Sequence, residues 1–181
     1  MKRSIWTVAI VYLSALCLVN TNAQAHVVFG AGQAEGGAYH VADLRIFHGC
    51  DGAATVKVTV EIPEGVTRVR PRAISGWDVS IDMVKLKTPV MLHGFEVHET
   101  VGSITWSGGA LPDFAYEQFD FHIMVPNQPG QVLSFPVHQE CVKGRLDWDQ
   151  KALNMKDFGE MEHPAPFITI TGITVSDQAK P

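Results

Sequence analysis

Motifs that mark common enzymes and metal sites are absent from this sequence of 181 residues. Its eight histidines include no H-x-H pair and no H-E-x-x-H motif, so they lack the spacing of a zinc peptidase site. No G-x-S-x-G segment is present, so the nucleophile motif of the α/β-hydrolases is missing as well. The sequence therefore gives no support to these two hydrolytic activities.

Positive charge is also scarce. The chain has 14 lysines and arginines against 19 aspartates and glutamates, which gives a formal net charge of −5. Proteins that bind DNA or RNA depend on lysine and arginine to neutralise phosphates. This balance excludes nucleic acid as an expected partner.

The first 25 residues have the layout of a secretory signal peptide. A short basic start is followed by an apolar run over residues 5–19 and by Ala23-Gln24-Ala25, a small-x-small cleavage pattern. About fifteen apolar residues are too few for a membrane span, which needs roughly twenty, and no second run of that length follows. We therefore expect cleavage after Ala25 and a periplasmic or secreted product that begins at His26 and has no membrane span. Loss of the two basic residues takes the formal net charge from −5 to −7.

The expected mature chain contains two cysteines, Cys50 and Cys141, because Cys17 leaves with the signal peptide. An even pair of cysteines outside the cytoplasm is typical of a disulfide. A bond between them would close a loop of about ninety residues, for which a chain-entropy treatment gives roughly 4–5 kcal/mol of stabilisation. The alternative is a thiolate metal site, but such sites usually offer more thiolates or a C-x-x-C pair. We predict the disulfide.

Short strands separated by turns dominate the rest of the chain. The stretch TVKVTVEIPEGV alternates apolar and polar residues, which predicts a half-buried strand over residues 56–62. Turn residues at Ser107-Gly108-Gly109 and at 126–130 separate other strands, and a short helix is expected over 149–158. Seven or more short strands predict an all-β protein, a β-sandwich over residues 26–175 followed by a flexible tail at 176–181. The other strands are expected at 39–47, 77–86, 94–106, 119–125, 132–139 and 167–175.

His26 becomes chemically unusual once the signal peptide is removed. A histidine at a free amino terminus presents an imidazole and an α-amine, with pKa values near 6.5 and about 7.7–8.0, so both release their protons to a metal readily at neutral pH. The two nitrogens can close a chelate ring on one ion, and the Irving–Williams order favours Cu(II) for such donors. The other histidines, among them His93 and His98, are expected to be surface or hydrogen-bonded residues.

From His26 onward the sequence resembles the YcnI-like family of secreted copper-binding proteins. The matching segments run in order over nearly the whole mature chain: HVVF at 26–29, IFHGCDGAATVKVTVEIPEGV at 46–66, ISGW at 74–77, ITWSGGALPD at 104–113, YEQFDF at 116–121, QECVKGRLDW at 139–148 and EHPAPFITIT at 162–171. The resemblance implies an immunoglobulin-like or cupredoxin-like β-sandwich. It also implies a Cu(II) site in which the mature N-terminal histidine is the single histidine ligand, a monohistidine brace.

Carried over residue by residue, the histidine ligand is His26, and the tryptophan that lies close to the metal in the family is Trp148. The family adds a glutamate ligand within an aromatic-Asp-Glu-Phe pattern, which reads YEQF at 116–119 here. If the phenylalanine sets the register, Gln118 occupies the ligand position, and Glu117 reaches the site only through a bulge, because neighbours on a strand point to opposite faces. We favour Glu117, since an amide is a poor substitute for a carboxylate. The alternatives are a solvent-facing Glu117 and a Trp148 that serves the core alone.

These features favour a protein that binds Cu(II) without catalytic turnover. Such a protein would be a copper chaperone or a copper-homeostasis carrier that exchanges copper with a membrane protein of copper delivery or uptake. A copper oxidoreductase is an alternative, by analogy with polysaccharide monooxygenases that also use an N-terminal histidine. Those sites add a second histidine, and this sequence marks out none. A structural or adhesive sandwich without metal is the other alternative.

Overall fold

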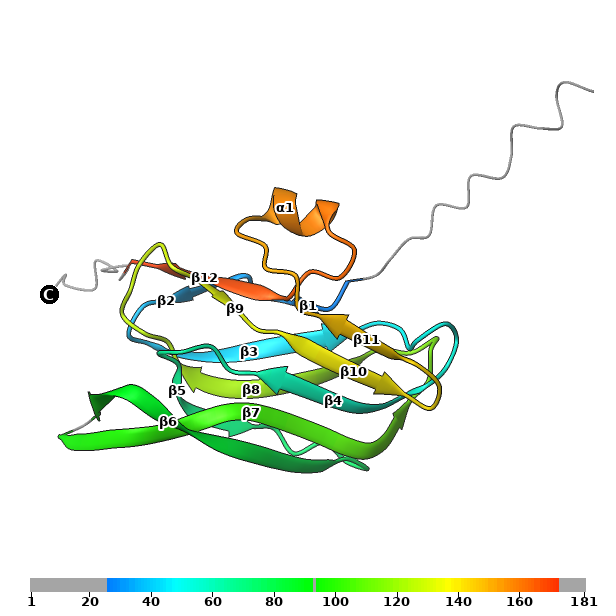
Figure 1. The fold of residues 1–181 in the computed structure, drawn as a ribbon, viewed down its shortest axis with the longest axis horizontal. Helices are drawn as coiled ribbons and strands as arrows, with labels where there is room; N and C mark the ends of the chain where they lie inside the picture. Colours follow the sequence, from blue (N-terminus) through cyan, green and yellow to red (C-terminus); the bar gives the residue numbers. More distant parts are fainter. Residues whose placement is uncertain (1–25, 93, 173–181) are drawn as a thin grey trace, which may run out of the picture.

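The computed structural model describes residues 26–92 and 94–172, which form a β-sandwich with one short helix (Figure 1). The prediction of an all-β sandwich with one disulfide is confirmed, because Cys50 and Cys141 are bonded. The predicted signal peptide, the predicted tail at 176–181 and His93 lie outside the described residues. Within the described ranges, no helix is long and apolar enough to cross a membrane.

One layer of the sandwich is a four-stranded sheet in the order β1-β3-β8-β5. Strands β3 and β8 pair antiparallel without a register shift, from Tyr39 opposite Met124 to Ile46 opposite Glu117. The prediction of strands near 39–47 and 119–125 is therefore confirmed, with β8 beginning two residues earlier than expected. The four strands are β1 (Val28–Phe29), β3 (Tyr39–Ile46), β8 (Glu117–Met124) and β5 (Thr67–Pro71).

The other layer is a five-stranded sheet in the order β11-β10-β4-β7-β6. The alternating stretch predicted as a strand forms β4, close to the centre of this sheet, with Val58 and Val60 fully buried. Strands β6 and β7 form a long hairpin whose tip extends beyond the other strands in Figure 1. The five strands are β11 (Arg145–Trp148), β10 (Val137–Cys141), β4 (Thr55–Glu61), β7 (Phe95–Leu111) and β6 (Asp78–Leu92).

A third sheet has three strands, and one of the predicted strands is divided between this sheet and the five-stranded sheet. Residues 132–139 do not form one strand, because Phe135-Pro136 separates β9 from β10, and proline has no N–H for a sheet ladder. Strand β10 joins the five-stranded sheet, whereas β9 pairs with β12, which also pairs with β2. The strands of this sheet are β2 (Gln33–Glu35), β12 (Phe167–Thr171) and β9 (Val132–Ser134).

The turn predicted at Ser107-Gly108-Gly109 is wrong, because these residues lie inside β7. Gly108 has a φ of +82°, and the pairing of β4 with β7 shifts register opposite this segment, so the glycines accommodate an irregularity in the ladder rather than a chain reversal. Gly109 also lies directly against Trp77, where a Cβ atom would come within 2.2 Å of the indole ring. Gly109 thus leaves room for the side chain of Trp77, which packs against the core.

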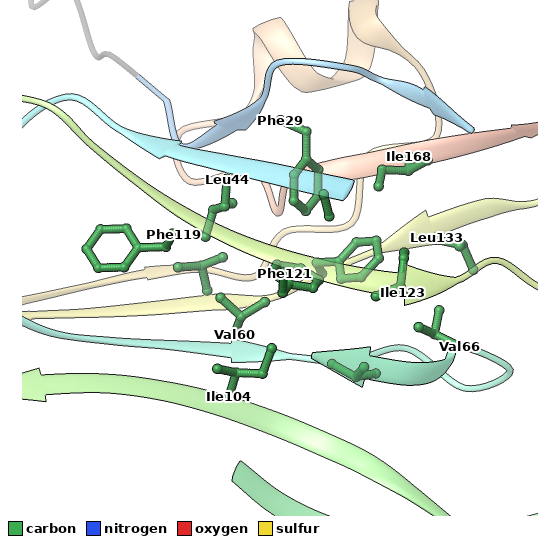
Figure 2. Close-up of a cluster of buried hydrophobic side chains, with 14 of the residues drawn as sticks. Phe29, Leu44, Val60, Val66, Ile104, Phe119, Phe121, Ile123, Leu133 and Ile168 are labelled. Carbon is green, nitrogen blue, oxygen red and sulfur yellow. The ribbon is translucent and has the colours of Figure 1, made fainter. Parts of the chain in front are cut away.

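The core lies between the inner faces of the two larger sheets (Figure 2). Apolar residues at every second position of β3, β8, β4 and β7 point inward, as the period of a strand requires. Trp106 is fully buried, and its Nε1 donates to the carbonyl of Arg72 at 2.9 Å. The central side chains include Leu44, Ile46, Val58, Val60, Ile104, Phe119, Phe121 and Ile123.

The helix α1 (Met155–Glu160) is shorter than the predicted range of 149–158 and begins later. Asn154 caps it, since its side-chain oxygen accepts hydrogen bonds from the backbone N–H groups of Lys156 and Asp157 at 2.9 and 3.0 Å. Phe158 is the buried residue of the helix and packs with Phe167 of β12. Figure 1 shows α1 and its flanking loops above β1 and β12.

The disulfide should contribute a large share of the stability. It joins two residues that are 91 positions apart in the chain, so its loss frees a long loop in the unfolded state. We expect the double variant Cys50→Ala/Cys141→Ala to lose about 2–5 kcal/mol in its free energy of unfolding, measured by urea titration. Reduction of the unmodified protein should give the same loss. An unchanged free energy of unfolding in both experiments would contradict this expectation.

A carboxylate pair surrounds His138 on the outer face of the five-stranded sheet. Its Nδ1 lies 2.5 Å from Oδ1 of Asp147, and its Nε2 lies 3.1 Å from Oε1 of Glu61. Burial lowers the pKa of His138, but the hydrogen bonds and charges of Asp147 and Glu61 outweigh burial, so the pKa is raised. The protonated imidazole is therefore the form that stabilises the fold.

The stability of the protein should consequently depend on pH through His138. Because the pKa of His138 is higher in the folded than in the unfolded protein, the protonated imidazole stabilises the fold fully below the unfolded-state pKa of about 6.5. This stabilisation is lost as the pH rises through the folded-state pKa. We expect His138→Gln to flatten the fall in the free energy of unfolding above about pH 6.5. The exposed His98, whose Nε2 lies 3.4 Å from Glu96, provides the control variant His98→Gln. Equal slopes for His138→Gln and the unmodified protein would count against this role.

Candidate functional site

The candidate site lies where the edges of the two larger sheets meet. Strand β1 is one edge of the four-stranded sheet, and β11 is one edge of the five-stranded sheet. His26 precedes β1 by two residues and Trp148 ends β11, and their ring centroids are 6.2 Å apart. Val27 and Phe29 are buried, so the backbone is held firmly just after His26. The structure thus brings together two of the residues that the sequence singled out.

Trp148 is a buried platform for histidines. Its side chain is only 1% exposed and belongs to the main core. Besides His26, the rings of His48 and His163 lie edge-on to it, with centroid distances of 5.8 and 5.2 Å. Trp148 is therefore a core residue that also contacts three histidine rings.

A buried amide holds this platform in place. Gln139 is completely buried, and its Oε1 accepts a hydrogen bond of 3.0 Å from Nε1 of Trp148. Its Nε2 donates to the carbonyl of His48 at 2.7 Å and to the hydroxyl of Thr55 at 2.8 Å. One side chain thereby fixes the indole, the loop that carries His48 and the start of β4.

The His26 imidazole is half-buried, and its surroundings lower its pKa. It packs edge-on against Phe158, with ring centroids 5.2 Å apart. Burial is the largest cause that lowers its pKa, followed by the nearby imidazoles of His163 and His48, while a hydrogen bond to the backbone of Met161 acts in the opposite direction. The net effect is a lowered pKa, so the ring is neutral over more of the pH range. A ring N–H that donates to a carbonyl leaves the other ring nitrogen as an acceptor, which is the form that binds metals.

His48 and His163 were not marked out by the sequence. His48 follows β3 in the loop that leads to Cys50, whereas His163 follows α1 in the loop that leads to β12. They are 115 positions apart, and neither has metal-site spacing with another histidine, so no local pattern could have linked them. Their common contact with Trp148 comes from the fold alone.

Glu117 and Gln118 lie at the beginning of β8, with β3 between them and β1. Glu117 is opposite Ile46 and shares its face, whereas Gln118 is opposite Arg45, and no bulge interrupts this pairing. The Oε1 atom of Glu117 accepts a hydrogen bond of 2.9 Å from the backbone N–H of Gln118. Among the described residues, no hydrogen bond or ion pair joins either side chain to His26.

The described part of the chain contains no group of three or more His, Cys, Asp or Glu side chains that could hold a metal ion. The chelate expected from the sequence is of a different kind, because it takes the amine and one imidazole nitrogen from a single residue. That amine is a backbone group of the mature terminus rather than a side chain. Its formation depends on cleavage after Ala25, a position outside the described residues.

Comparison with known proteins places this chain in a family. Residues 26–170 match the model of a domain of unknown function, DUF1775. A crystal structure of an uncharacterized protein from Nocardia farcinica with an immunoglobulin-like fold is similar, with 28% sequence identity and a TM-score of 0.59. That similarity covers 81% of this chain and 98% of the other. No curated protein matches the sequence. Because the domain match covers most of the sequence, the chain belongs to the DUF1775 family.

Proposed function

We propose that this protein is a periplasmic or extracellular Cu(II)-binding protein, which carries copper for delivery or homeostasis rather than catalysing a reaction. The observation that supports this most directly is the environment of His26. The residue at the predicted cleavage site packs its imidazole against Trp148 and Phe158 with one ring nitrogen engaged by the carbonyl of Met161.

The donors of this site suit Cu(II). After cleavage, the α-amine and the free ring nitrogen of His26 would provide two nitrogen ligands from one residue, and nitrogen donors favour Cu(II) over the other divalent metals of the first row. A hydrogen bond from the remaining ring N–H to a carbonyl is the usual outer-shell support of a metal-binding histidine. The lowered pKa of His26 reduces the competition from protons at neutral pH.

Trp148 and Glu117 have supporting roles in this proposal. Trp148 would cover one side of the ion and limit the access of water, since its indole is buried and fixed by Gln139. Glu117 would supply an oxygen ligand from the face that it shares with Ile46, without the bulge expected from the sequence, because a carboxylate offsets the charge of Cu(II) and an amide such as Gln118 does not. The ion would be exchanged with a membrane protein of copper delivery or uptake.

Blocking the terminal amine should abolish tight binding. We expect the mature chain to bind one Cu(II). Adding one residue before His26 should weaken the affinity for Cu(II) by at least about a hundredfold. Losing an outer-shell partner of a metal ligand already costs roughly ten- to hundredfold in affinity, and losing the ligand itself costs more. The measurement is a Cu(II) titration followed by electron paramagnetic resonance, with the N-terminus verified by intact mass.

Two variants separate the terminal site from adventitious binding to histidines. His26→Ala should behave like the extended protein, whereas His98→Ala, which changes an exposed histidine on the β6–β7 hairpin, should leave the affinity unchanged. If the extended protein binds Cu(II) as tightly as the mature one, the proposed function is wrong.

The oxygen ligand can be identified with a matched pair of variants. Glu117→Gln removes one charge at constant shape, and Gln118→Ala removes the amide of the neighbouring position. We expect Glu117→Gln to weaken Cu(II) binding by about tenfold or more and to shift the copper spectrum, whereas Gln118→Ala leaves both unchanged. The reverse result would assign the position to Gln118.

A further inference from the structure

His163 lies on the same buried ring as His26. Its ring centroid is 5.2 Å from that of Trp148, compared with 6.2 Å for His26. Among the neighbouring imidazoles that lower the pKa of His26, that of His163 has the larger effect, ahead of His48. The two imidazoles therefore contact the same indole, although 137 positions separate them in the sequence.

The backbone of His163 is held in position from both sides. Its N–H donates to Oε1 of Gln150 at 2.8 Å, and its carbonyl accepts from the N–H of Gln150 at 3.1 Å. The next residues, Pro164, Ala165 and Pro166, are buried, and the N–H of Ala165 donates to the carbonyl of Gln150 at 2.8 Å. A histidine on such a loop has a fixed place relative to β11 and to the site.

The imidazole of His163 differs from that of His48 in its partners. Nδ1 of His48 lies 2.5 Å from the carbonyl of Gly49, so one of its ring nitrogens is engaged within its own loop. In the described part of the chain, no hydrogen bond or ion pair engages the His163 ring, whose contact is with Trp148. The ring is half-buried against the same indole as His26, and its nitrogen atoms are available for a ligand.

We propose that His163 provides a second imidazole to the copper site, so that the ion is held by the amine and ring of His26 together with the ring of His163. This inference rests on the proposed function. It replaces a single-histidine site by one with three nitrogen donors, a set that suits Cu(II). In this proposal the loop between α1 and β12 contributes to the copper site, because it holds Met161, which accepts a hydrogen bond from His26, and His163.

The test is a count of imidazoles on Cu(II) by pulsed electron paramagnetic resonance, which detects the remote nitrogen of each coordinated ring. We expect two imidazoles in the mature protein and one in His163→Gln, with an affinity for Cu(II) that is about tenfold or more weaker. The matched control is His48→Gln, which changes the other histidine on Trp148 and should retain two imidazoles. Circular dichroism and thermal unfolding verify that each variant is folded.

The outcomes separate this inference from the proposed function. One imidazole in the unmodified mature protein, or an unchanged count in folded His163→Gln, would overturn the role of His163 and leave the terminal site intact. Loss of the second imidazole in His48→Gln instead would assign it to His48 and also overturn the inference. Absence of tight Cu(II) binding in the mature protein would remove the proposed function itself. The number of imidazoles bound to Cu(II) in the unmodified protein tests the role of a second histidine even if His163→Gln does not fold.

Discussion

The buried amide of Gln139 is the constraint on which the candidate site depends. The side chain is fully buried and makes three hydrogen bonds, and an unpaired amide there would cost roughly 1–3 kcal/mol. The side chain can satisfy these bonds only if the indole of Trp148 and the carbonyl of His48 are in place. The Cys50–Cys141 disulfide supports the same arrangement, because each cysteine follows one partner of this network by two residues. The indole of Trp148, which the three histidines contact, is thus held in place by buried hydrogen bonds and packing rather than by surface contacts.

The site can form only where separate edges of the sandwich meet. Strand β1 brings His26, β11 brings Trp148, and the loop around α1 brings Phe158 and His163. Two of these elements are edge strands, which leaves room for a chain terminus without breaking a sheet. A metal ligand at a free amine requires a terminus that does not fray. The burial of Val27 and Phe29 directly after His26 meets that requirement.

Local patterns predicted the strands that have a regular period and failed where the chain departs from it. Strand β4 could be predicted because seven residues alternate strictly, whereas β11 has four residues and only two apolar side chains. The glycines at 108 and 109 predict a turn, since a sequence does not show whether a glycine reverses the chain or makes room for a side chain such as Trp77. The family resemblance points to Trp148, but the contacts of its indole with His48 and His163 join segments that are far apart in the sequence. No spacing rule contains that information.

The pairing of β10 with β11 explains how one short hairpin can carry two opposite electrostatic environments. Residues on its inner face, such as Gln139 and Trp148, are buried, while His138 and Asp147 pair on the outer face. On the outer face the carboxylates raise the pKa of His138, and on the inner side burial and neighbouring imidazoles lower the pKa of His26. The inner environment disfavours a proton on the His26 ring, so it favours the neutral imidazole, which is the form that binds a metal. In the proposed site a metal cation would bind several ligand atoms at once, whereas a proton binds only one nitrogen. This difference would favour copper binding over protonation of the ligands at neutral pH.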